Sequence, residues 1–100
     1  MTEDRVECRT PAAGKTGSTR IVKWKYDAVR TAILDAVKDA GNGGLAFKDL
    51  KEAVRTRMDE TDLENLGKLG WYTTTVKLNM EVEGELARLP KVSPQRIILA

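Results

Sequence analysis

Residues 70–99 read GWYTTTVKLNMEVEGELARLPKVSPQRIIL, and this stretch decides the fold. Residues 71–83 carry apolar or methyl-bearing side chains at the three- and four-residue spacing of an amphipathic helix. These side chains are Thr73, Val76 and Met80. Gly84 follows, and glycine is the usual residue just past a helix end because it adopts the left-handed conformation without strain. The stretch therefore predicts a helix that ends at Gly84.

Two short apolar runs follow this glycine, at residues 86–89 and 95–99. A five-residue Pro-x-x-x-Pro segment separates them, and it cannot continue either run as a strand. The pattern predicts a C-terminal β-hairpin.

A helix closed by a glycine and followed by a hairpin that carries arginines resembles the recognition helix and wing of winged helix-turn-helix proteins. The resemblance covers about residues 26–99. It implies an α+β, mainly helical domain with three main helices and a C-terminal β-hairpin. It also implies a DNA-binding module, for example a transcriptional regulator. Its third helix would enter the major groove while the hairpin contacts phosphates.

Two helices are predicted before this stretch, at about residues 25–40 and 46–58. Their inward stripes are Tyr26, Val29, Ile33 and Val37 in the first, and Phe47, Leu50, Val54 and Met58 in the second. Residues 21–26 alternate in the manner of a short extended segment. Thr61 and Glu64 have the spacing of a capping box, which predicts one short helical turn before the third helix.

The chain predicts one small domain at residues 20–100, preceded by a flexible arm at residues 1–19. The arm shows no apolar periodicity, so we expect it to be dispensable for folding. Cys8 is the single cysteine and cannot form an internal disulfide. No apolar run has the length of a membrane span. We therefore expect a soluble, cytoplasmic protein that has no membrane partner.

The composition argues against an enzyme. The chain has no histidine, which removes the commonest general base and the commonest metal ligand. Cys8 lies in the arm without a histidine to activate it. Glu81, Glu83 and Glu85 are clustered, but residues two apart on a helix face different directions, so we interpret them as a solvated helix end. We predict no catalytic residues, no cofactor and no metal site.

The exposed side of the third helix and the hairpin supply the candidate DNA contacts. On the helix, the polar side chains that can reach phosphates or base edges are Tyr72, Thr74, Thr75, Lys77 and Asn79. On the hairpin, a five-residue loop places Arg88 directly opposite Arg96, with Lys91 near the tip. A phosphate between the two arginines would relieve their repulsion. The alternative is that both side chains extend into water at little cost.

Two function classes fit these observations, and we predict the first, double-stranded DNA binding, with the second as the alternative. Double-stranded DNA binding is favoured by the basic hairpin and by the basic helix at residues 46–58. A protein-interaction or dimerisation module without DNA binding is favoured by a net charge of only +2 and by the local charge of −2, one lysine against three glutamates, over residues 70–85. Trp71, Leu78 and Val82 also recur with Thr75 at helical spacing. This second stripe is either core or, where exposed, a homodimer surface.

Overall fold

The computed structural model describes residues 4–10, 19–90 and 95–100. Within these residues the chain forms two small antiparallel sheets and four α-helices. In chain order the elements are β1 (Arg5–Cys8), β2 (Thr19–Val22), α1 (Lys23–Ala40), the 3-10 turn η1 (Gly41–Gly43), β3 (Leu45–Ala46), α2 (Phe47–Arg55), α3 (Glu60–Leu66), α4 (Leu69–Val82), β4 (Leu86–Arg88) and β5 (Arg96–Leu99). The predicted α+β, mainly helical class with a C-terminal hairpin is confirmed.

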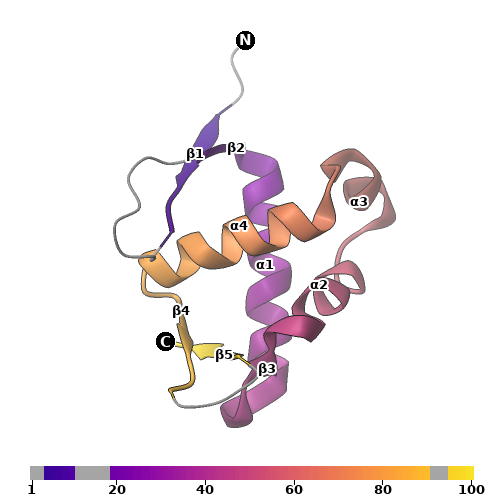
Figure 1. Ribbon diagram of the computed structural model, residues 1–100. Coiled ribbons are helices and arrows are strands. Elements are labelled where there is room, and N and C mark those ends of the chain that lie inside the picture. Colours follow the sequence, from indigo (N-terminus) through magenta and orange to yellow (C-terminus); the bar gives the residue numbers. More distant parts are fainter. Residues whose placement is uncertain (1–3, 11–18, 91–94) are drawn as a thin grey trace.

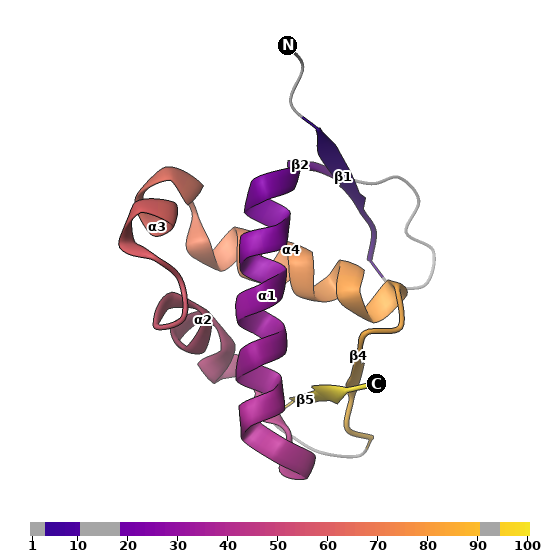
Figure 2. The same ribbon diagram turned by 180° about the vertical axis from the view of Figure 1, so that it is seen from behind.

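Helix α1 is the central element on which the others pack. Helix α4 crosses in front of α1 in Figure 1 and behind it in Figure 2, so it lies against one side of α1. All four residues of the predicted α1 stripe are buried, and they meet buried side chains from both α2 and α4. These partners are Leu50, Val54, Val76 and Met80. The helical periodicity therefore identified the core correctly.

The helix boundaries differ from the prediction at three places. The extended segment predicted at residues 21–26 ends at Val22, and Trp24 and Tyr26 belong to α1. Helix α2 is shorter than predicted, whereas α3 is a seven-residue helix rather than one turn. Asp59 is the N-cap residue of α3 and makes no side-chain capping bond, so Thr61 and Glu64 do not form a capping box.

The end of α4 follows the prediction. Gly84 has a φ of +80°, in the left-handed region that favours glycine. The amide of Gly84 donates to the carbonyl of Glu81 at 3.2 Å, and the amide of Glu85 donates to that of Met80 at 2.9 Å. This pair of bonds is a Schellman motif, which satisfies carbonyls that the helix end would otherwise leave free.

The hairpin register differs from the prediction by one residue. Strand β5 lies between β3 and β4, and Arg88 pairs with Ile97 rather than with Arg96. The amide of Leu89 donates to the carbonyl of Arg96 at 2.9 Å. Because side chains alternate along a strand, this shift puts Arg88 and Arg96 on opposite faces of the sheet. The repulsive arginine pair expected from the sequence is therefore absent.

The N-terminal segment contains a strand where a flexible arm was expected. Residues 5–8 pair with β2 in an antiparallel sheet. Cys8 at one end of β1 is only 3% exposed, and Ile21 in β2 is 2% exposed. The prediction is wrong for these residues because two apolar side chains, Val6 and Cys8, alternate with polar ones and pack on the core. Residues 1–3 and 11–18 of the predicted arm lie outside the described part of the chain.

Candidate interaction surface

Helix α4 carries most of the predicted DNA contacts, and its inner side faces the core. Thr73, Val76 and Met80 are buried, as predicted from their spacing. Two of the polar residues expected on the outer side, Lys77 and Asn79, are buried as well. The expected exposure of these two side chains is wrong.

Lys77 is 0% exposed and is held by polar partners inside the protein. Its Nζ donates to Gln95 Oε1 at 2.7 Å and lies 2.9 Å from Glu81 Oε2. The same Nζ is 4.6 Å from the centroid of the Phe47 ring. Burial lowers the pKa of Lys77, and the ion pair with Glu81 acts in the opposite direction by favouring the charged form. Lys77 therefore joins α4, α2 and the residue that precedes β5.

Glu81 links α4 to the hairpin. Arg88 Nε donates to Glu81 Oε1 at 2.6 Å, so one carboxylate is shared by Lys77 and Arg88. The side chain of Glu81 is only 8% exposed. The interpretation of Glu81 as part of a solvated helix end is wrong, although its i,i+4 spacing from Lys77 was a visible signal of a pair.

Glu85 also has a partner, whereas Glu83 is exposed as interpreted. The Arg30 Nε donates to the two Glu85 carboxylate oxygens at 3.0 Å and 2.9 Å. The pKa of Arg30 is raised chiefly by this hydrogen bond. Glu85 therefore fastens the end of α4 to α1.

Asn79 and Arg96 are engaged within the fold. Asn79 Nδ2 donates to the Tyr26 hydroxyl at 2.8 Å, and Asn79 Oδ1 accepts from the Arg9 amide at 2.9 Å. Arg96 Nη1 donates to the Gly44 carbonyl at 3.0 Å. Lys91, the third predicted hairpin contact, lies outside the described residues.

Tyr72, Thr74 and Thr75 are the remaining predicted contacts, and all three are partly exposed. Lys25 Nζ lies 3.5 Å from the Tyr72 hydroxyl and 5.2 Å from the centroid of its ring. The same ammonium donates to the Leu66 carbonyl at 3.1 Å, at the end of α3. Tyr72 is thus held at the junction of α1 and α3, and the two threonines are the polar side chains of this set without such contacts in the described part of the chain.

The outer side of α4 carries the second apolar stripe of the sequence. At 100° per residue, its four members fall within one narrow strip opposite the buried side of the helix. We call them the α4 stripe: Trp71, Thr75, Leu78 and Val82. Trp71 is 46% exposed and Val82 is 40% exposed, whereas Thr75 and Leu78 are half-buried. No other helix lies in front of α4 in Figure 1, which agrees with the exposure of Trp71 and Val82.

The two ends of the α4 stripe carry opposite charges. Lys68, the residue before α4, is exposed, and Glu83, the residue after it, is also exposed. Neither side chain has an ion-pair partner within residues 4–10, 19–90 and 95–100. Lys51 adds a second positive charge near the N-terminal end of α4. Its side chain passes close to Gly70, where an added Cβ atom would lie 3.7 Å from the Lys51 Cδ. The surface is therefore apolar along its length and polar at its ends.

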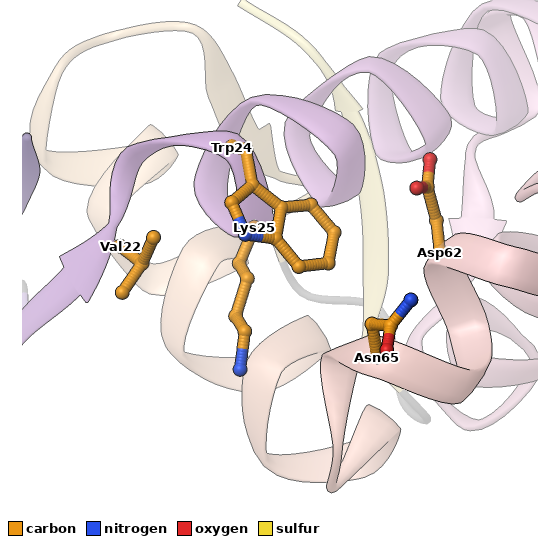
Figure 3. A pocket seen from close by; sticks show the side chains of 5 residues that line it. All are labelled: Val22, Trp24, Lys25, Asp62 and Asn65. Atoms are coloured by element: carbon orange, nitrogen blue, oxygen red, sulfur yellow. The ribbon is translucent and has the colours of Figure 1, made fainter. Parts of the chain in front are cut away.

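A shallow cavity of about 530 Å³ lies apart from this stripe, between the start of α1 and α3. Its lining residues are Val22, Trp24, Lys25, Asp62 and Asn65 (Figure 3). Among the described residues, no three His, Cys, Asp or Glu side chains lie close enough together to hold a metal ion. In the same part of the chain, no helix is both long enough and apolar enough to cross a bilayer.

Cys8 provides a prediction about pH. Burial raises the pKa of its thiol from 9.0 to about 11, so the folded protein keeps a proton that the unfolded chain loses between these values. Stability from Cys8 is therefore complete below pH 9 and is lost as pH rises toward 11. We expect the difference in unfolding free energy between wild type and Cys8→Ala to shrink by about 2 kcal/mol from pH 8 to pH 10.5.

Urea unfolding of both proteins at the two pH values measures this difference. Comparing the two proteins removes the contribution from the burial of Tyr26, which raises its pKa, and that from the burial of Lys77, which lowers its pKa. A difference that does not change with pH contradicts the assignment to Cys8.

Comparison with known proteins identifies a family. A family model described as a family of unknown function, DUF6958, matches residues 5–97. No curated protein and no solved structure matches the chain. The matched segment begins at the first residue of β1 and ends at Ile97, so it includes the N-terminal strand, β4 and the first two residues of β5. The chain belongs to the DUF6958 family.

Proposed function

We propose that this protein is a cytoplasmic protein-interaction module with a winged-helix-like arrangement, and that the α4 stripe is its contact surface. The observation that carries the proposal is the exposure of Trp71 and Val82 on the outer side of a helix whose inner side is already packed on the core. An exposed row of large apolar side chains is costly for a monomer in water and is typical of a surface that binds another protein.

The engagement of the expected DNA contacts inside the fold supports this choice. Lys77 and Arg88 share the carboxylate of Glu81. Asn79 uses both ends of its amide, and Arg96 donates to a backbone carbonyl. DNA binding draws its affinity chiefly from positive charges that neutralise phosphates. If these side chains formed a DNA-binding surface, they would first have to break the contacts that hold α4 to the rest of the domain.

DNA binding remains the second candidate because three exposed lysines lie on α2 and before α4. Lys48 and Lys51 are one helical turn apart on α2, and the side chain of Lys51 approaches Gly70 in the first turn of α4. Lys68 precedes the same helix. These lysines could hold a DNA backbone without the hairpin arginines.

The two functions are separated by a stripe variant and a charge variant. Leu78→Glu with Val82→Glu changes the α4 stripe, and Lys48→Glu changes the basic side of α2 away from that stripe. Each variant is immobilised and exposed to a cell extract and to free copies of this chain. We expect the wild type and the lysine variant to bind the same proteins, free copies of the chain included, and the stripe variant to bind none of them. We also expect no saturable binding of a mixed-sequence duplex at low salt. Duplex binding that weakens with salt, and that only the lysine variant loses, contradicts the proposal.

A further inference from the structure

The partner of the α4 stripe can be inferred from the stripe itself. We propose that it is a second copy of this chain, packed with its α4 antiparallel to the first across a two-fold axis. This inference rests on the proposed function, because it names the partner of the same surface. Two properties support it, namely the spacing of the stripe and the charges at its ends.

The spacing of the α4 stripe is the same in both directions. Trp71, Thr75, Leu78 and Val82 follow one another at intervals of four, three and four residues. A two-fold axis beside the midpoint of the helix therefore brings Trp71 of one copy to Val82 of the other, and Thr75 to Leu78. Each large side chain then meets a smaller one, which lets the two helices approach closely. A parallel pair would instead place the two indoles against each other.

The charges at the ends of α4 favour the same orientation. In the antiparallel pair, Lys68 of one copy lies at the same end of the interface as Glu83 of the other, because their positions differ by only about 3 Å along the helix axis. Each dimer gains two such pairs. A parallel pair would bring Lys68 to Lys68 and Glu83 to Glu83, and like charges side by side repel. The antiparallel arrangement also opposes the two helix dipoles.

The size of the surface indicates a weak dimer. A helix of 14 residues is about 21 Å long, and a strip of this length buries only a few hundred Å² on each partner. This area is at the low end for a specific interface, so we expect association in the micromolar to millimolar range. Measurements must therefore extend to high protein concentration.

The first test is a charge exchange followed by sedimentation equilibrium at low salt. Lys68→Glu alone and Glu83→Lys alone are each expected to weaken self-association by about three- to tenfold, because each creates two like-charge contacts per dimer. The double variant restores opposite charges and is expected to recover the wild-type constant. Lys48→Glu and Glu60→Lys are matched controls on exposed sites of α2 and α3, and they should change nothing.

The second test determines orientation. In a Cys8→Ala background, a mixture of Lys68→Cys and Glu83→Cys chains should be joined by a short bismaleimide linker, whereas Lys68→Cys alone should not. In an antiparallel pair, the two copies of residue 68 lie about 25 Å apart along the helix axis, beyond the reach of such a linker. Efficient joining of Lys68→Cys to itself overturns the antiparallel arrangement.

The outcomes distinguish this inference from the proposed function. A dimer that depends on Leu78 and Val82 but shows no recovery in the double charge variant overturns the arrangement and leaves the interaction module in place. A wild type that stays monomeric at millimolar concentration overturns the second copy as partner. The proposed function itself fails when the stripe variant also retains every protein that the wild type retains, or when the chain shows salt-sensitive duplex binding that only the lysine variant loses.

Discussion

Replacing Glu81 with glutamine is expected to lower the free energy of unfolding by about 3–5 kcal/mol at pH 7. The change leaves the fully buried Lys77 ammonium with neutral amide oxygens, that of Gln95 and that of the substituted side chain, in place of a carboxylate. Arg88 also loses its partner, but its side chain is 46% exposed and can be hydrated. The upper limit of the loss is set by deprotonation, since neutralising a lysine at pH 7 costs about 5 kcal/mol.

Urea unfolding followed by tryptophan fluorescence measures this loss. Glu83→Gln is the matched control, because Glu83 is exposed and lies two residues from Glu81, and it should change stability by less than about 0.5 kcal/mol. The double variant Lys77→Met, Glu81→Leu should recover most of the lost stability, since it removes both buried charges and keeps their volume. Equal effects of Glu81→Gln and Glu83→Gln would show that Lys77 is hydrated in solution.

Deleting residues 1–10 is expected to lower the melting temperature by more than about 10 °C. The deletion removes the buried side chain of Cys8 and the strand that pairs with β2. It also takes the Arg9 amide from the buried Asn79 Oδ1. Together these losses amount to roughly 2–4 kcal/mol, and each kcal/mol shifts the melting temperature of a domain of this size by about 4–8 °C.

Differential scanning calorimetry provides the measurement. Deletion of residues 1–3 alone is the control, because these residues precede β1, and it should leave the melting temperature unchanged. A chain without residues 1–10 that melts within about 2 °C of the full chain would support a dispensable arm, the original expectation from the sequence.

The parts of the fold that depend on local pattern could be predicted from the sequence. The stripe of α1 is buried as its period indicates, and α4 ends at Val82, just before Gly84, whose positive φ completes the C-terminal turn. These features depend on neighbours within a few residues. They therefore form within a single helix or turn.

The parts that depend on distant neighbours could not be predicted. Val6 and Cys8 form a strand only because β2, beyond residues 11–18, lies beside them. The loop length alone did not determine the hairpin register, and an error of one residue reversed the relation between Arg88 and Arg96. Lys77 lies beside Val76 on the helix, and it becomes buried only because the hairpin folds back over that side of α4.

The central claim is that the outer side of α4 contacts protein rather than DNA. Amide NMR spectra of the isotopically labelled chain test it most directly, recorded on dilution from millimolar to micromolar concentration and again after addition of a mixed-sequence duplex at low salt. We predict shifts on dilution at Trp71, Thr75, Leu78 and Val82, and none when the duplex is added. Saturable shifts in α4 and the hairpin with duplex, together with no change on dilution, would contradict the claim.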